Sequence, residues 1–128
     1  MSWLQIGQDI QGITDNDNYG LRTAISGDGS VVAFSAPYGD GGGSDSGEVT
    51  VYSLTNNVWV ALGSIISGDA GGESSAVKLN NDGTRLIVGE RKTPDNQDVP
   101  KGTAKIYEYS SGSWSQIGQD IVGAGGGD

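Results

Sequence analysis

The residues best suited to chemistry in this 128-residue chain are carboxylates in two acidic loops. In the loop DNDNYG, Asp15 and Asp17 have the spacing of the first two ligands of an EF-hand calcium loop, but Tyr19 stands at the third ligand position. A second, glycine-rich loop, YGDGGGSDSG, offers Asp40 and Asp45. Aspartate is also a common turn former. We therefore expect both loops to be solvated turns, and calcium binding is the alternative.

Composition excludes several other kinds of chemistry. The chain has 16 acidic and 7 basic residues, a net charge of −9, which would repel nucleic acid and anionic lipid. It has no His and no Cys, so the usual general base, thiolate catalysis and Cys-based metal sites are excluded. Carboxylates alone can serve a glycosidase, but no spacing singles out a pair here. We predict no enzyme, with no catalytic residue, cofactor or metal.

Three tryptophan segments reveal an internal repeat. Trp3, Trp59 and Trp114 begin the segments WLQIGQDIQG, WVALGSIISG and WSQIGQDIVG, at spacings of 56 and 55 residues. A glycine follows each Trp by four positions. The first and third copies, SWLQIGQDI and SWSQIGQDI, differ at one of nine residues. A period of this size is typical of an array of supersecondary units.

Two further blocks repeat between the tryptophans. AISGDGSVVAFSAP (24–37) aligns with KLNNDGTRLIVGER (78–91), and GEVTVYSL (47–54) aligns with GTAKIYEY (102–109). We therefore divide the chain as follows: an N-terminal outer (closing) strand at 1–12, a first blade at 13–68, a second blade at 69–123 and a Gly-rich tail at 124–128.

Each unit is predicted to contain four short strands. In the first unit they lie near 21–26, near 30–36, in EVTVYSL and in VWVALGSII. TAIS and VVAFSA are nearly continuous apolar runs, which is typical of strands buried on both faces, whereas EVTVYSL alternates. Asp28-Gly29 is predicted to form a two-residue hairpin with both residues at positive φ. No segment has convincing helical periodicity.

The predicted fold class is all-β. Four antiparallel strands per unit, repeated about every 55 residues, are what a β-propeller requires. A blade cannot bury its faces alone, so Trp, Ile and Tyr side chains would fill the space between blades. An open β-sandwich is the alternative.

These motifs resemble a known family. The patterns WLQIGQDIQG, YGLRTAISGDGSVVAFSAP and GEVTVY look like the FG-GAP repeats of integrin-α-type β-propellers, and more closely like their bacterial and algal relatives with short hairpins. The resemblance covers essentially the whole chain, with departures in the second unit, where Glu90-Arg91 replace Ala36-Pro37. It implies a non-enzymatic adhesion or interaction role, often extracellular or at the cell surface.

The resemblance also raises the family's calcium loop, of the type D-x-[DN]-x-D-G. Here the equivalent hairpins are reduced to SGDGS and NNDGT, with one carboxylate each, and calcium needs six to eight oxygens. We therefore expect that calcium site to be missing. The N-terminus has no secretory signal, and no apolar run is long enough to span a membrane.

The duplicated strand suggests how a ring would close. Propellers have about four to eight blades, so two blades require partners. Trp114 can complete the second blade from the same chain, or Trp3 can complete it from a neighbouring chain, by the logic of domain swapping. We expect a homo-oligomer, with a six-bladed trimer favoured over an eight-bladed tetramer. The assembly residues are predicted to be Trp3, Ile6, Ile10, Trp114, Ile117 and Ile121.

The sequence thus predicts a non-catalytic scaffold or adhesion module whose first partner is itself. A carbohydrate- or calcium-dependent binding module is the alternative function. Tryptophan and tyrosine side chains could stack on sugars, but their phase within the repeat favours a role in the core.

Overall fold

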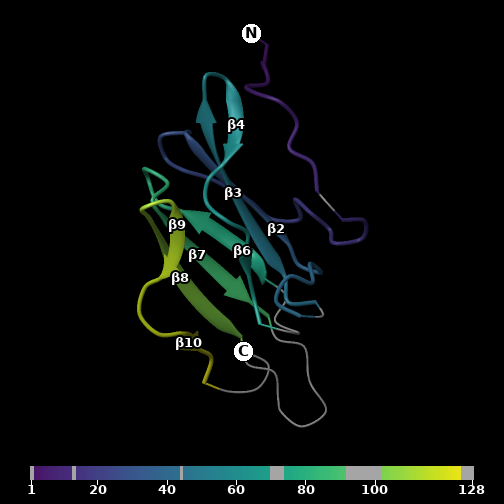
Figure 1. Ribbon diagram of the computed structural model, residues 1–128, viewed down its shortest axis with the longest axis vertical. Coiled ribbons are helices and arrows are strands. Elements are labelled where there is room, and N and C mark those ends of the chain that lie inside the picture. The colour runs from purple at the N-terminus through teal and green to yellow at the C-terminus, as the bar shows by residue number, and fades with distance from the viewer. Residues whose placement is uncertain (1, 13, 44, 70–73, 92–101, 125–128) are drawn as a thin grey trace.

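A computed structural model of the chain describes residues 2–12, 14–43, 45–69, 74–91 and 102–124. The described part is all-β: ten strands form two antiparallel sheets and no helix (Figure 1). This confirms the all-β fold class. No helix in these residues is long and apolar enough to cross a membrane.

Each sheet is a meander of consecutive strands. The first contains β1 (Thr23–Ile25), β2 (Val31–Ala36), β3 (Glu48–Thr55), β4 (Val58–Ala61) and β5 (Ile66–Ser67). The second contains β6 (Ser74–Leu79), β7 (Arg85–Glu90), β8 (Thr103–Ser110), β9 (Ser113–Gln116) and β10 (Ile121–Val122). In both sheets the third strand, β3 or β8, pairs with the two short strands that follow it. These two short strands are the two parts of one Trp segment, which is interrupted between them.

The predicted burial patterns are partly confirmed. β2 is buried on both faces along most of its length, as its apolar run predicts, and β3 alternates between buried and half-buried residues. β1 is shorter than expected, and Ile25 is exposed. The prediction that both strands of this pair are buried on both faces is wrong for β1, because only Ala24 faces the core, whereas Thr23 and Ile25 lie on the exposed outer face.

The predicted hairpin at Asp28-Gly29 is wrong in type. Only Gly29 has a positive φ, of 76°, and the turn is wider, closed by a hydrogen bond from the Gly29 amide to the Ser26 carbonyl (2.9 Å). Asp28 Oδ1 accepts hydrogen bonds from the Ser30 amide (2.9 Å) and from the hydroxyls of Ser26 and Ser30 (both 2.7 Å). Bonding to Ser30 and Ser26 holds the pKa of the Asp28 carboxyl below its usual value. The carboxylate therefore stabilises a wider turn.

Tight two-residue turns occur at other hairpins. Asn56 and Asn57, between β3 and β4, have φ values of 49° and 63°, and Ser111 and Gly112, between β8 and β9, have 52° and 88°. Positive φ at both central residues matches the twist of antiparallel strands. These tight turns thus fix the Trp-bearing strands, β4 and β9, against β3 and β8.

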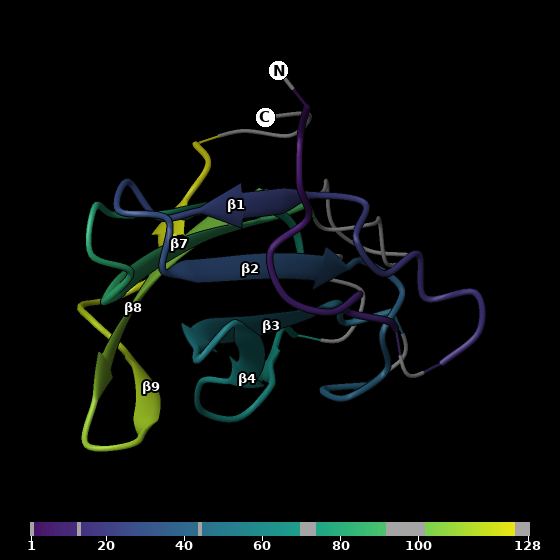
Figure 2. The ribbon, with the colours of Figure 1, turned by 90° about the horizontal axis from the view of Figure 1, so that it is seen from above.

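The two sheets stack face to face (Figures 1 and 2), with β6 against β1 and β2. We call the inner surface of the first sheet its rear face and the inner surface of the second sheet its front face. The shared core consists of eight buried residues: Val31, Ala33, Val49, Val51, Ile66, Val77, Leu86 and Val88. Tyr107 and Trp114 pack at its border, so the space between the sheets is filled mainly by Val side chains rather than by the predicted Trp, Ile and Tyr.

Substitution of Leu86 by Ala tests this core. Leu86 is fully buried in the cluster, so its truncation leaves a cavity and should lower the free energy of unfolding by about 2–5 kcal/mol. Urea unfolding followed by circular dichroism measures the loss. Val58→Ala, at an exposed position of β4, is the control and should change stability by about 0.5 kcal/mol or less. Equal effects of the two substitutions would contradict the assigned core.

Candidate interaction site

Two tryptophans occupy equivalent places in the two sheets. Trp59 lies opposite Leu54, and Trp114 lies opposite Tyr109, with ring centroids of the latter pair 5.3 Å apart. Trp114 Nε1 donates a hydrogen bond to the Leu62 carbonyl (2.8 Å). Trp59 Nε1 donates to the Ile6 carbonyl (2.9 Å) in the same way. In each case the acceptor lies in the preceding copy of the Trp segment.

A glycine makes each of these contacts possible. Gly7 and Gly63, which follow the acceptor carbonyls, both have φ of +77°. A Cβ added to Gly7 would lie 2.5 Å from Trp59 Cδ1, and one added to Gly63 would lie 2.8 Å from Trp114 Cδ1. We call this unit the Trp–Gly clasp: an indole packed on a left-handed glycine, with its N–H bonded to the preceding carbonyl.

Residues 2–12 form no strand, yet they are held on the outer, front face of the first sheet. The side-chain amide of Gln8 pairs with the backbone of Trp59: Nε2 donates to the Trp59 carbonyl (2.8 Å), and the Trp59 amide donates to Oε1 (2.9 Å). A groove of about 550 Å³ remains between this segment and the sheet, lined among others by Ile10, Val32 and Phe34. The segment thus covers the face loosely (Figure 2).

The third copy of the Trp segment forms β9 and β10, unlike the first copy, but it shares two local features with the first. Gln116 Nε2 donates to Asp120 Oδ1 (2.6 Å), just as Gln5 Nε2 donates to Asp9 Oδ1 (2.8 Å). Gly118 has φ of +72°, close to that of the other two glycines. No described atom lies within 4 Å of the place where its Cβ would be. The third copy therefore forms the acceptor half of a clasp without a tryptophan in it.

The six predicted assembly residues fall into two separate groups. In the N-terminal segment, Trp3 is fully exposed, Ile6 supplies the carbonyl that Trp59 binds, and Ile10 is half-buried in the groove.

In the third copy, Trp114 is clasped to the preceding copy, whereas Ile117 and Ile121 are 39% and 58% exposed. Sequence reasoning aligned the glycines but assigned them no role, and it missed Gln8. The identity of this glutamine in the first and third copies is the signal that points to its role.

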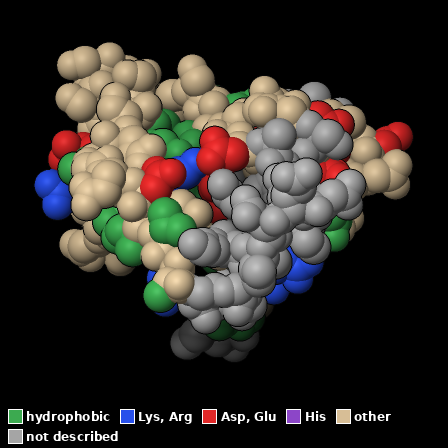
Figure 3. All heavy atoms as spheres, turned by 90° about the horizontal axis from the view of Figure 1, so that it is seen from below, with side chains coloured by type: hydrophobic (Ala, Val, Ile, Leu, Met, Phe, Trp, Pro, Cys, Tyr) green, Lys and Arg blue, Asp and Glu red, His purple; other side chains and the backbone are tan. Residues whose placement is uncertain are grey.

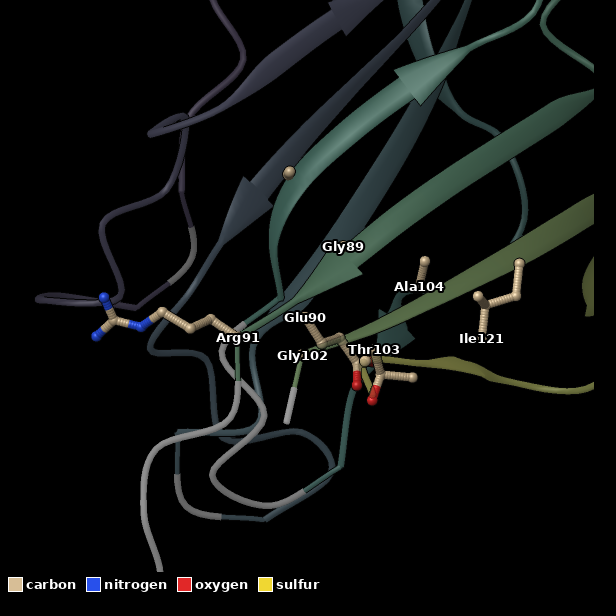
Figure 4. Close-up of a pocket in the computed structure, with 9 residues that line it drawn as sticks. Gly89, Glu90, Arg91, Gly102, Thr103, Ala104 and Ile121 are labelled. Carbon is tan, nitrogen blue, oxygen red and sulfur yellow. The ribbon is translucent and has the colours of Figure 1, made fainter. Parts of the chain in front are cut away.

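A hollow on the rear face of the second sheet lies beside Ile121. It measures about 380 Å³ and is lined mainly by small residues, including Ala76, Gly89 and Ala104. Figure 4 shows Ala104 and Ile121 on one side of the sheet, with Glu90 pointing to the other. This surface is apolar and open.

A buried ion pair lies on the opposite, front face of the second sheet. Lys105 Nζ is 3.2 Å from Glu90 Oε1 and 3.3 Å from Asp69 Oδ2. Burial alone would lower the pKa of Lys105, but the charges of Glu90 and Asp69 outweigh it, so this pKa is raised. Two departures from the repeat, Glu90 for Ala36 and Lys105 for Thr50, signal this pair in the sequence, and sequence reasoning missed it.

Acidic side chains lie at several places on the surface (Figure 3), but the described residues contain no group of three or more His, Cys, Asp or Glu side chains that could hold a metal. In the second acidic loop, Asp40 Oδ1 accepts a hydrogen bond from the Asp45 amide (2.8 Å), so the carboxylate stabilises its own loop.

The first acidic loop is anchored by Tyr19. Its hydroxyl shares a hydrogen bond with Thr50 Oγ1, and its ring lies 5.8 Å from that of Phe34. Burial raises the pKa of the Tyr19 hydroxyl to about 12. The residue that interrupts the calcium-ligand pattern is thus part of the apolar packing on the first sheet.

No family model, curated protein or solved structure matches the chain. The resemblance to FG-GAP repeats accordingly stays a prediction from the motifs.

Substitution of Gly63 by Ala should destabilise the protein more than the same change at Gly118. Both glycines have the same backbone conformation, so each change costs roughly 1–2 kcal/mol of left-handed strain. Only at Gly63 does the new methyl group also displace an indole and break a hydrogen bond, which adds about 1 kcal/mol. Urea unfolding of the two variants at low protein concentration measures the difference. Equal losses would mean that the clasp contributes no stability.

Proposed function

We propose that this chain is a non-catalytic interaction module, two blades of a β-propeller, that closes its ring by associating with copies of itself. The carrying observation is that the chain contains one complete stacking relation between successive units, made by Trp114 on Gly63, and also the halves needed to repeat it. Those halves are the Trp59 face of the first sheet and the Gly118 acceptor of the second.

The order of strands supports blades over the alternative sandwich. Each sheet is made of strands consecutive in the chain, and among the described residues no strand crosses to the other sheet. Sandwiches of the immunoglobulin type exchange strands between sheets through Greek-key connections. Stacked meanders are the repeating unit of a propeller.

Unequal burial at equivalent positions supports continuation of the stack. Ala33 and Ile66, on the rear face of the first sheet, are 0% and 9% exposed because the second sheet covers them. Their equivalents on the second sheet, Ile87 and Ile121, are 42% and 58% exposed. Ile87 and Ile121 thus expose apolar surface at positions that are buried in the first sheet. Because the front face of the second sheet covers those positions in the first sheet, a partner with a similar face is favoured here.

The adhesion-type role is the biological context that the FG-GAP resemblance suggests. The lack of histidine and cysteine and the use of Asp28 and Asp40 as turn formers support a non-catalytic role. The acidic surface favours a protein partner over nucleic acid.

Light scattering after size exclusion tests the proposal. One chain weighs 13.1 kDa, so a six-bladed trimer would weigh roughly 39 kDa and an eight-bladed tetramer roughly 52 kDa. We expect a discrete closed species, with the trimer favoured, at physiological salt and tens of micromolar protein. A protein that stays monomeric up to millimolar concentration would refute self-assembly, and a continuous range of masses would refute ring closure.

A further inference from the structure

Resting on this proposed function, we propose that the acceptor formed by Ile117, Gly118 and Gln119 binds Trp59 of a second copy of the chain, and that residues 2–12 of that second copy compete for the same tryptophan. The chain would then associate head to tail, and its own N-terminal segment would limit the association.

The acceptor carries the groups that already bind Trp59 within one chain. Ile6, Gly7 and Gln8 supply a carbonyl, a left-handed glycine and a bidentate amide to this tryptophan. Ile117, Gly118 and Gln119 are the same three residue types in the same order, in a segment whose internal hydrogen bond and glycine φ match. Because Ile6–Gln8 bind Trp59 within the chain, the matching residues Ile117–Gln119 can bind the same tryptophan of a second copy.

The amide pairing of the Ile117 segment leaves its carbonyl available. The Ile117 amide donates to the Ile106 carbonyl (2.7 Å), as the Leu62 amide donates to the Val51 carbonyl (2.8 Å). Leu62 uses its own carbonyl to accept the Trp114 indole. In the described residues, the Ile117 carbonyl is the corresponding acceptor that receives no tryptophan.

Side-chain sizes on the two outer faces are complementary. Within one chain, the rear face of the first sheet carries Ser35 paired with Val49, and the front face of the second sheet carries Val88. On the open rear face, the equivalent pair is the smaller Gly89 and Ala104, which leaves the hollow of about 380 Å³ (Figure 4). On the other outer face, which residues 2–12 cover loosely, the equivalent of Val88 is the larger Phe34. A second copy therefore places its larger side chain where the smaller pair makes room.

The intramolecular competitor is weakly held. The described hydrogen bonds that join residues 2–12 to the first sheet involve Trp59 alone, through Ile6 and Gln8. Trp3 at the beginning of the segment is fully exposed. When the acceptor of another chain binds this Trp59, it replaces these hydrogen bonds with equivalent ones. The association also buries the apolar faces of two sheets.

Strand exchange is the competing route to assembly. In that route residues 2–12 stay on their own Trp59 and displace β9 from β8 of a neighbouring chain. The structure disfavours it, because the tight Ser111–Gly112 turn joins β8 to β9 and fixes their register. The two routes make opposite demands on Gly7.

Two matched substitutions separate the routes. Asn tolerates the left-handed conformation, so Gly7→Asn and Gly118→Asn keep the backbone while adding a side chain against the indole. Gly118→Asn should lower the association constant at least about tenfold, and Gly7→Asn should raise it severalfold by releasing the competitor. Gly112→Asn, at another open left-handed glycine, is the control and should leave association unchanged. Sedimentation equilibrium of the full chain measures all three, and circular dichroism verifies folding.

Gln119→Ala supplies a second test if Gly118→Asn does not fold. It removes the amide that would bind the Trp59 backbone from an exposed position, and it should also weaken association.

The outcomes are distinguishable from failure of the proposed function. Assembly that Gly118→Asn and Gln119→Ala leave intact would overturn the inference while self-assembly stands. Assembly that falls with Gly7→Asn would identify strand exchange and also overturn the inference. A wild-type chain and a Gly7→Asn variant that both stay monomeric would overturn the inference and the proposed function together.

Discussion

The packing of an indole on a left-handed glycine is the contact on which the rest of the structure depends. A tryptophan can approach the backbone this closely only where no Cβ intervenes, and only at positive φ does the chain present the preceding carbonyl to the indole N–H. Between the two sheets this contact is made by Trp114 at Gly63, at the border of the shared core. The aliphatic core fills the space between the sheets beside it.

The same contact is made by Trp59 and by Trp114. Trp59 and Trp114 meet different chain segments, one irregular and one interrupted between β4 and β5, yet both use the same carbonyl and glycine. A geometry that persists in two different contexts is determined by local sequence. The third copy has a similar φ at Gly118 without a tryptophan, so this backbone conformation does not depend on contact with an indole.

Much of this architecture could be predicted from the sequence, because the repeat aligns residues whose roles are geometric. The repeat predicted two similar sets of antiparallel strands, which form the two sheets, and the alternation in EVTVYSL predicted the faces of β3. Turn type could not be predicted from Asp-Gly alone, since the serines around Asp28 compete for its carboxylate and favour a wider turn.

The predicted assembly residues show a similar limit. Sequence reasoning selected the large apolar side chain of Ile6, but what contacts Trp59 there is the Ile6 backbone carbonyl and the adjacent Gly7. Every residue has a backbone carbonyl, so a sequence does not show which carbonyl accepts a hydrogen bond. Only a neighbouring residue such as the glycine indicates it. The Lys105–Glu90 pair is likewise visible only as two coupled departures from the repeat.

The near-identity of the first and third copies has an energetic consequence for assembly. A tethered segment competes at an effective concentration that is commonly millimolar for short linkers, so an identical segment on a second molecule would lose at micromolar concentrations if the clasp acted alone. In the proposed assembly, association would therefore draw its advantage from the sheet faces, where Phe34 and the Gly89–Ala104 hollow are complementary in size. A net charge of −9 on each copy opposes that advantage through repulsion, which salt screens. In the proposed assembly the clasp would provide register and apolar burial would provide affinity, while the N-terminal segment would set the concentration at which the chains associate.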